Sequence, residues 1–195
     1  MPKCSAGIDM KHYLFTVFML LMLLSSFKAS AQRFSISTNI LDYACLGTMN
    51  VECAYSVSRY WSLTAGAEYN PFTFRSGQQD QFQLRQRSCS LGARLWPWHT
   101  WSGWWVSGKL RYQEYNFGGI LSKSTDEGDR VGVVVCAGYT HMLSPHLNIE
   151  FGLGAWSGLD WFCQYECQRC GQTLLTGRRW FVLPDDIMLS LVYVF

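Results

Sequence analysis

Long hydrophobic runs are scarce in this sequence of 195 residues, and the one that is present, YLFTVFMLLMLL, lies near the beginning at residues 13–24. A helix that spans a membrane needs about 20 consecutive apolar residues. The lack of a second long run, together with a mean hydropathy near zero, excludes a helical membrane protein. It does not exclude a membrane barrel, because strands of alternating polarity average out their hydrophobicity.

Charged residues are also few, and neither sign dominates. They make up 15% of the chain, and the formal net charge of +2 gives no indication of a nucleic-acid ligand or of a strongly acidic partner. Aromatic residues are plentiful by comparison, at 16% with 9 tryptophans. Of the 8 cysteines, Cys4 lies in the N-terminal segment described next, so an odd number remains, and an odd number cannot form a complete disulfide framework.

The first 31 residues have the features of a cleaved export signal. Lys3 and Lys11 supply positive charge, the hydrophobic run at 13–24 follows, and ASA at 29–31 fits a small-x-small cleavage site. No cysteine lies beside this site, which argues against processing as a lipoprotein. We therefore predict a signal peptide at 1–31 and a single barrel domain at 32–195.

Hydrophobic residues alternate with other residues along most of the remaining chain, as in strands with one apolar face. Seven such faces are found by taking every second residue of 51–57, 61–69, 89–95, 104–112, 131–139, 147–155 and 187–195. None of the residues on these faces is charged. With a first strand at 33–40, the pattern predicts eight strands.

The opposite faces carry three acids and three bases among small polar residues, which suggests a network of paired charges inside a barrel. These residues are Glu52, Glu68, Arg94, Lys109, Arg111 and Glu150. A Lys or Arg facing lipid at mid-membrane costs about 2–4 kcal/mol, so the uncharged faces are suited to lipid. The alternative is a soluble lipocalin-like barrel, whose apolar face points inward. We favour an all-β fold, an eight-stranded antiparallel transmembrane up-and-down β-barrel of OmpA-like size.

The links between the expected strands alternate in length, as they do in outer-membrane barrels, which have short periplasmic turns and longer extracellular loops. The short links are 58–60, 97–103 and 142–146; the long ones are 71–82, 116–129 and 158–184. Aromatic residues lie at the strand ends and predict two rows at the membrane surfaces. The periplasmic row comprises Tyr55, Trp61, Trp104, Tyr139, Tyr193 and Phe195, and the outer row Tyr69 and Tyr112.

The last strand is expected to pair with the first, which closes the barrel and leaves no exposed edge in the membrane. Its aromatic end, Tyr193 and Phe195, resembles the C-terminal signal by which the barrel-assembly machinery recognises outer-membrane barrels. Because the chain ends there, we expect no peptidoglycan-binding domain after the barrel.

Histidine offers little support for catalysis. Outer-membrane enzymes that modify lipid A use a histidine near the outer leaflet, whereas His99, His141 and His146 fall in or beside predicted periplasmic turns. A general base must lie within hydrogen-bond reach of its nucleophile, and a wall roughly 25 Å tall separates the two ends. We predict no catalytic residues and no cofactor. A lipid-modifying enzyme and a narrow pore remain as alternatives.

A cluster of cysteines, CQYECQRCG, lies in the longest predicted outer loop. A disulfide among Cys163, Cys167 and Cys170 is the first interpretation, because it would restrict a long flexible segment. Metal binding is the second, since the pair Cys167 and Cys170 has the spacing of half a zinc site but no second pair lies nearby. Redox catalysis is the third, since the motif lies on no strand–helix unit of the thioredoxin type, and inert free thiols are the last.

Several stretches resemble a known family: STNILDYA (37–44), YNPFTF (69–74), GARLWPW (92–98), YNFGGI (115–120), CQRCG (167–171) and the ending LVYVF. They are similar to a family of unknown function that comprises small outer-membrane barrels of gut and oral Gram-negative anaerobes, often encoded near fimbrial subunits. The resemblance implies an outer-membrane location with extracellular loops and a surface or fimbrial partner. We therefore expect a non-enzymatic structural or surface-interaction protein. The aromatic segments YNPFTF and YNFGGIL would either bind a partner or pack the loops together.

Overall fold

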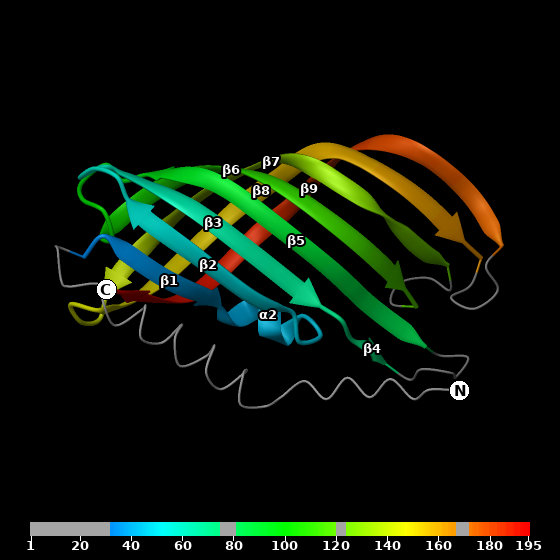
Figure 1. The fold of residues 1–195 in the computed structure, drawn as a ribbon, viewed down its shortest axis with the longest axis horizontal. Helices are drawn as coiled ribbons and strands as arrows, with labels where there is room; N and C mark the ends of the chain where they lie inside the picture. Colours follow the sequence, from blue (N-terminus) through cyan, green and yellow to red (C-terminus); the bar gives the residue numbers. More distant parts are fainter. Residues whose placement is uncertain (1–31, 75–80, 120–123, 167–171) are drawn as a thin grey trace, which may run out of the picture. The chain divides into compact units, whose positions relative to one another are not determined.

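Eight antiparallel strands follow one another around a closed barrel in the computed structural model (Figure 1), which describes residues 32–74, 81–119, 124–166 and 172–195. The strands are β1 (Phe34–Asn39), β2 (Met49–Ser56), β3 (Trp61–Asn70), β5 (Phe82–Leu95), β6 (Gly103–Gly118), β7 (Thr125–Met142), β8 (Leu147–Tyr165) and β9 (Thr173–Val194). A two-residue strand, β4 (Thr73–Phe74), pairs with β5, and a short helix, α2 (Ile40–Ala44), follows β1. In the described ranges, no helix has the length and apolar character needed to cross a membrane.

The barrel occupies residues 33–195. The predicted signal peptide at 1–31 lies outside the described residues. β1 pairs with β9, from Ser35 opposite Val194 to Asn39 opposite Ser190, and this closes the barrel. The predicted eight-stranded antiparallel barrel is thus confirmed, including the pairing of its last strand with its first.

The strands are staggered as well as closed. Following the paired residues once around the barrel leads back to β1 about ten residues further along the strand, a stagger that goes with a strand tilt of roughly 35–45°. A barrel of eight strands has an interior just wide enough for side chains. Long polar side chains on the inner face therefore have to fold against one another.

The apolar faces of the strands point away from the interior. On β6, Trp104, Val106 and Leu110 are exposed, whereas Lys109 and Arg111 on the opposite face are buried. The same division holds on β3 and β7, where the alternate apolar positions are exposed. The inward-pointing apolar face that a lipocalin-like barrel would have is therefore not observed on these strands.

The strands at the outer end are longer than the alternation predicts. β8 and β9 have 19 and 22 residues and continue through most of 158–184, the segment predicted as the longest loop. β6 and β7 likewise take up much of the predicted loop 116–129. The prediction fails here because backbone pairing continues beyond the last strictly apolar position, where the outer face already carries charged residues such as Asp129 and Arg178.

The wall of the barrel is consequently unequal in height. β1, β2 and β3 have 6, 8 and 10 residues, and α2 follows directly on β1. The outer ends of the longer strands form what we call the outer extension, comprising residues 82–87, 113–118, 125–130, 160–165 and 173–183 (Figure 1). Asn39, the N-cap of α2, accepts a hydrogen bond from the Leu41 backbone at 3.3 Å and so marks the end of β1.

Candidate functional site: the barrel interior and its outer rim

Four of the six predicted interior charges form one connected network, which we call the lower network. Arg94 contacts Glu150 through Nη1 at 2.9 Å and Glu52 through Nη2 at 2.6 Å. Lys109 Nζ lies 2.8 Å from the other oxygen of Glu52, and Thr140 donates to Glu150 at 3.0 Å. The structure thus brings together side chains from five strands, β2, β5, β6, β7 and β8.

The remaining two predicted charges form an interior ion pair, with Arg111 Nη2 3.3 Å from Glu68 Oε1. The side chains of Arg94, Lys109 and Arg111 are at most 5% exposed. Buried charges of this kind are tolerated only when paired and hydrogen-bonded, and removal of one partner from a buried pair costs about 3–5 kcal/mol. The interior is therefore an electrostatically matched core.

Three tryptophans fill the interior at the end of the barrel opposite the outer extension. Trp96, Trp101 and Trp105 are almost completely buried, and Trp96 Nε1 donates to Ser62 Oγ at 2.9 Å. The guanidinium of Arg94 lies 4.2 Å from the centre of the Trp105 ring, a cation–π contact. Sequence reasoning missed this plug, although adjacent Trp104 and Trp105 cannot both face outward on one strand.

Little space is left inside the barrel. A cavity of about 40 Å³ remains, lined by residues that include Glu52, Glu68, Lys109 and Arg111. A water molecule needs a cavity of about 10–15 Å³, so the cavity has room for a few waters at most. Buried side chains therefore fill much of the described interior.

A second cluster, the upper network, lies inside the outer extension. Asp160 is fully buried and accepts hydrogen bonds from Tyr115 and Arg179, each at 2.8 Å, while Arg130 Nε lies 3.4 Å away. Burial raises the pKa of Tyr115 to about 12; the charge of Arg130 opposes this rise, and the hydrogen bond to Asp160 adds to it. Sequence reasoning missed this cluster because Asp160 and Arg179 were assigned to the predicted loop 158–184.

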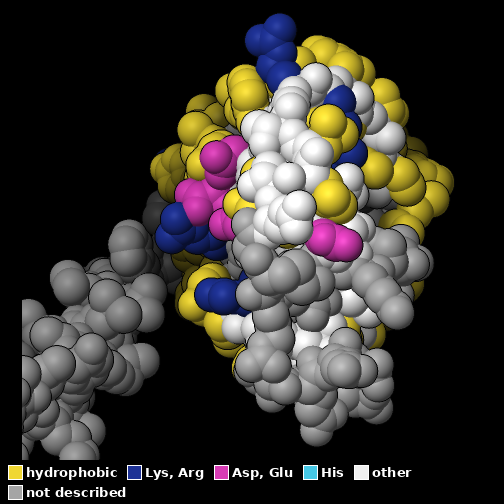
Figure 2. Space-filling view, turned by 90° about the vertical axis from the view of Figure 1, so that its right-hand side faces the viewer, with side chains coloured by type: hydrophobic (Ala, Val, Ile, Leu, Met, Phe, Trp, Pro, Cys, Tyr) yellow, Lys and Arg dark blue, Asp and Glu magenta, His cyan; other side chains and the backbone are white. Residues whose placement is uncertain are grey.

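Charged residues also occupy the outer face of the extension, directly beyond the apolar positions. Arg87 Nε donates to Glu114 at 2.6 Å, and the hydroxyl of Tyr112 lies 3.2 Å from Glu114 and 3.1 Å from Asp129. Figure 2, which shows the outer end, places acidic and basic side chains near one another beside hydrophobic surface. A groove of about 550 Å³ adjoins Arg87, Glu114 and Asp129 and also includes Arg85.

The exterior aromatic residues lie as two rows at the predicted places. All eight lie on the outer face, where Tyr139 is half-buried and the other seven are exposed: Tyr55, Trp61, Trp104, Tyr139, Tyr193 and Phe195 at one end, and Tyr69 and Tyr112 toward the other. Neighbouring members of the first row touch, with ring centres 5.2 Å apart for Trp104 and Tyr139 and 5.0 Å apart for Tyr193 and Phe195. Between the rows, the outward positions of β6 are Val106, Gly108 and Leu110.

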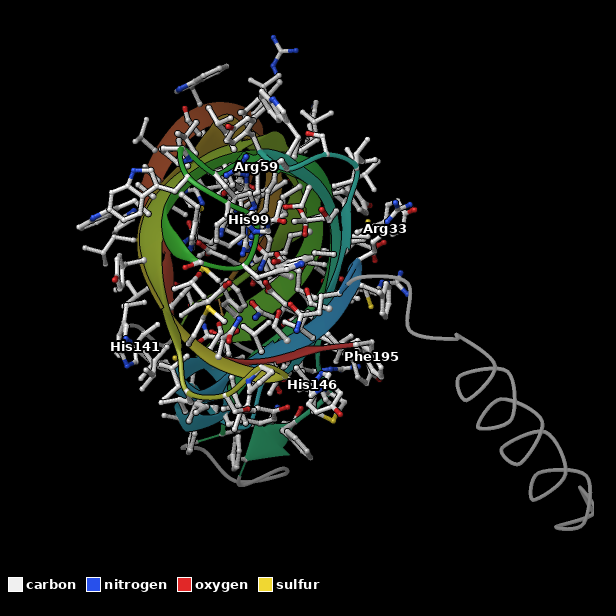
Figure 3. The ribbon with its side chains drawn as sticks, turned by 90° about the vertical axis from the view of Figure 1, so that its left-hand side faces the viewer. Arg33, Arg59, His99, His141, His146 and Phe195 are labelled. Carbon is white, nitrogen blue, oxygen red and sulfur yellow. The ribbon has the colours of Figure 1, made fainter. Side chains whose placement is uncertain are left out.

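The histidines lie at the end that carries Phe195. Figure 3 looks at this end and shows His99 over the opening, with His141 and His146 at the surrounding rim. His99 donates through Nδ1 to its neighbouring carbonyl at Thr100, and His146 donates to the carbonyl of Val194, each at 2.8 Å. No histidine in the described ranges lies in the outer extension.

Cys163 lies on β8 and not in a loop, which corrects the prediction for this residue. It is a free thiol on the outer face, where Thr176 Oγ1 lies 3.4 Å from its sulfur. Hydrogen bonds from Thr176 and Tyr165 lower the pKa of this thiol. Cys167 and Cys170 lie outside the described residues, so the disulfide stays a prediction. Within the described ranges, no group of three or more His, Cys, Asp or Glu residues could hold a metal ion.

The fold and the interior together define a class: a closed, eight-stranded antiparallel β-barrel with an apolar outer wall and a charged, filled interior. The chain belongs to the family described as protein of unknown function (DUF3575), whose family model matches residues 17–195. The resemblance to a family of unknown function is thus confirmed, whereas its taxonomic range and fimbrial gene neighbourhood stay predictions. No curated protein and no solved structure matches the chain.

Proposed function

We propose that this protein is an outer-membrane barrel of a Gram-negative bacterium, with the outer extension facing the cell exterior, and that it acts there by binding rather than by catalysis. The observation that carries the proposal is the uncharged exterior band between the two aromatic rows. Charged side chains begin just beyond this band, at Arg87, Glu114 and Asp129 on three neighbouring strands.

The height of the band fits an outer membrane. Eight residues separate Trp104 from Tyr112 on β6, and a rise of about 3.3 Å per residue at a tilt near 40° gives about 20 Å along the barrel axis. Outer-membrane barrels have apolar bands about 25 Å tall, flanked by aromatic rows. The two rows would therefore lie at the two membrane surfaces.

The packed interior supports a role other than conduction. The lower network and the tryptophan plug lie across the interior of the barrel, and the cavity of about 40 Å³ beside the lower network is too small for a hydrated ion path. The histidines support a role other than lipid modification, because those described lie at the end away from the outer leaflet. Binding at the outer extension is the function that remains.

The outer extension gives such binding a surface. From Leu159 to Tyr165, β8 rises about 15 Å at a tilt near 40°. The family resemblance described above adds fimbrial subunits as the class of partner to examine first.

The experiment is gel mobility of the outer-membrane fraction, with and without boiling in detergent. A closed barrel resists cold detergent, so we expect the unheated and heated forms to migrate differently. Protein carrying Arg at both Leu91 and Leu110, two exposed positions within the band, serves as a control that should fail to insert. Recovery of the native protein in the soluble fraction, without a heat-dependent shift, would overturn the proposal.

A further inference from the structure

The outer part of β9 has an unpaired edge. β1 ends at Asn39, opposite Ser190, and beyond that point β9 pairs with β8 alone among the described strands. The side chain of Asn39 continues the pairing a little further, since its amide donates to the Ile187 carbonyl at 3.2 Å and accepts from the Leu189 backbone at 3.0 Å. Above this point no described strand covers β9.

The direction of the free backbone groups can be assigned. Along a strand, the N–H and C=O groups of successive residues point alternately to the two sides. The carbonyl of Phe181 accepts from the side-chain hydroxyl of Ser157 on β8 at 3.1 Å, so this carbonyl points toward β8 and the odd-numbered residues here face β8. Pro184, which has no N–H, then faces the free side, the position that proline takes in edge strands. The free groups accordingly belong to Thr176, Arg178, Trp180 and Val182.

We propose that this edge, residues 174–182, receives an extended segment of another protein as an additional strand. A row of unpaired N–H and C=O groups is a template for strand addition, in which main-chain hydrogen bonds supply affinity and alternate side chains supply specificity. The side chains of Trp180 and Val182 beside the edge are each 68% exposed. An added strand would cover both.

Arg178 and the residues outward of it lie beyond the proposed lipid layer, whereas the register connects Trp180 and Val182 to Val131 and Val133 at the outer part of the apolar band. The inference therefore rests on the proposed function. The register connects Arg178 through Trp161 to Asp129, which is beyond Val131, the last apolar position of β7. A second copy of this chain is a poor occupant in that setting. Two copies in one membrane are related by an axis along the membrane normal, so strands tilted by roughly 40° would cross at about 80° and could not pair.

The side chains along the edge specify the chemistry of the partner segment. Residues on its outward face would lie beside Arg178, Trp180 and Val182, which project to the same side of the sheet. Arg178 forms no ion pair with any residue in the described ranges, so it can oppose an acid. We therefore expect an acidic residue followed, at alternate positions, by two apolar residues, or the reverse order.

The test uses a phage-displayed library of random ten-residue peptides, selected on the full barrel in detergent. We expect enriched peptides to carry the acidic–x–apolar–x–apolar pattern in one direction. Val182→Pro removes one free N–H and leaves the hydrogen bonds to β8 intact. The loss of one hydrogen bond to the added strand should weaken the binding of an enriched synthetic peptide by about tenfold. The matched control Val182→Thr keeps the N–H and should bind within about twofold. Arg178→Glu should shift the preference from acidic to basic peptides.

Amide hydrogen exchange separates the remaining outcomes. In the free protein, the amides of Arg178, Trp180 and Val182 should exchange rapidly and should become protected when the peptide binds. Failure to enrich any peptide, equal binding to the proline and threonine variants, or protection without peptide would overturn the inference. The heat-dependent gel shift of the same preparation reports on the proposed membrane location separately, so each proposal can fail without the other.

Discussion

Replacement of Arg94 by methionine should destabilise the barrel by about 3–5 kcal/mol. Arg94 is the cation shared by Glu150 and Glu52, and all three belong to the lower network. Without it, Glu150 would be buried with Thr140 as its remaining partner, whereas Glu52 would keep Lys109. The loss of about 3–5 kcal/mol includes the lost cation–π contact with the Trp105 ring, because such contacts contribute about 0.5–2 kcal/mol.

The assay is reversible urea unfolding of the barrel in lipid vesicles, with the free energy extrapolated to water. A double-mutant cycle isolates the charge effect, because Arg94→Met combined with Glu150→Gln removes both charges and leaves a neutral side chain facing Thr140. We expect the double variant to be more stable than Arg94→Met alone. Arg94→Lys keeps the positive charge but cannot contact both carboxylates through separate nitrogens of a guanidinium. Its free energy of unfolding should therefore lie between those of the wild type and Arg94→Met. A loss below about 1 kcal/mol for Arg94→Met, or a double variant less stable than the single one, would refute the reasoning.

Two further predictions address other parts of the barrel. A side chain at Gly138 would collide with the Trp105 ring and the Phe151 carbonyl, so Gly138→Val should lower the unfolding free energy by about 1–3 kcal/mol, or more if the backbone must move, and should disturb the near-ultraviolet tryptophan signal. Stability equal to wild type would show that the tryptophan plug is loosely packed. In a variant with Cys167 and Cys170 changed to serine, Cys163 should react with iodoacetamide at lower pH than an ordinary thiol, because its lowered pKa increases the thiolate fraction at neutral pH. Thr176→Val removes one of the hydrogen bonds that lower this pKa and should shift the pH dependence of the reaction rate to higher pH. An unchanged pH dependence would contradict this assignment.

The sequence predicts the barrel well in the band where contact with lipid would restrict the residue types of the outer face. A strand facing a membrane must keep every second residue uncharged, and that rule leaves a visible alternation from Trp104 to Tyr112 and from Val131 to Tyr139. It also places the six interior charges on the inner face before any pairing is known. The exterior faces and the interior charge set could therefore be predicted.

The same rule fails in the outer extension, which on the proposed orientation faces water instead of lipid. In the outer extension both faces carry polar and apolar residues, so 158–184 reads as a loop although β8 and β9 continue through most of it. Asp160 and its partners Tyr115, Arg130 and Arg179 come together through strand register, which the alternation does not encode. The choice of partners within the lower network also depends on register, because Arg94 contacts residues 42 and 56 positions away.

The most direct test of the membrane assignment is the depth dependence of an arginine on the outer face of β6. Gly108 lies midway between Trp104 and Tyr112, and a side chain built there meets no other atom within 4 Å, so its substitution is free of steric cost. Unfolding from lipid vesicles should show Gly108→Arg less stable than Gly108→Leu by about 2–4 kcal/mol, with the arginine penalty falling to about 0–1 kcal/mol at Trp104 and Tyr112. An equal, small effect of arginine at all three positions would mean that this face does not meet lipid and would contradict the membrane assignment.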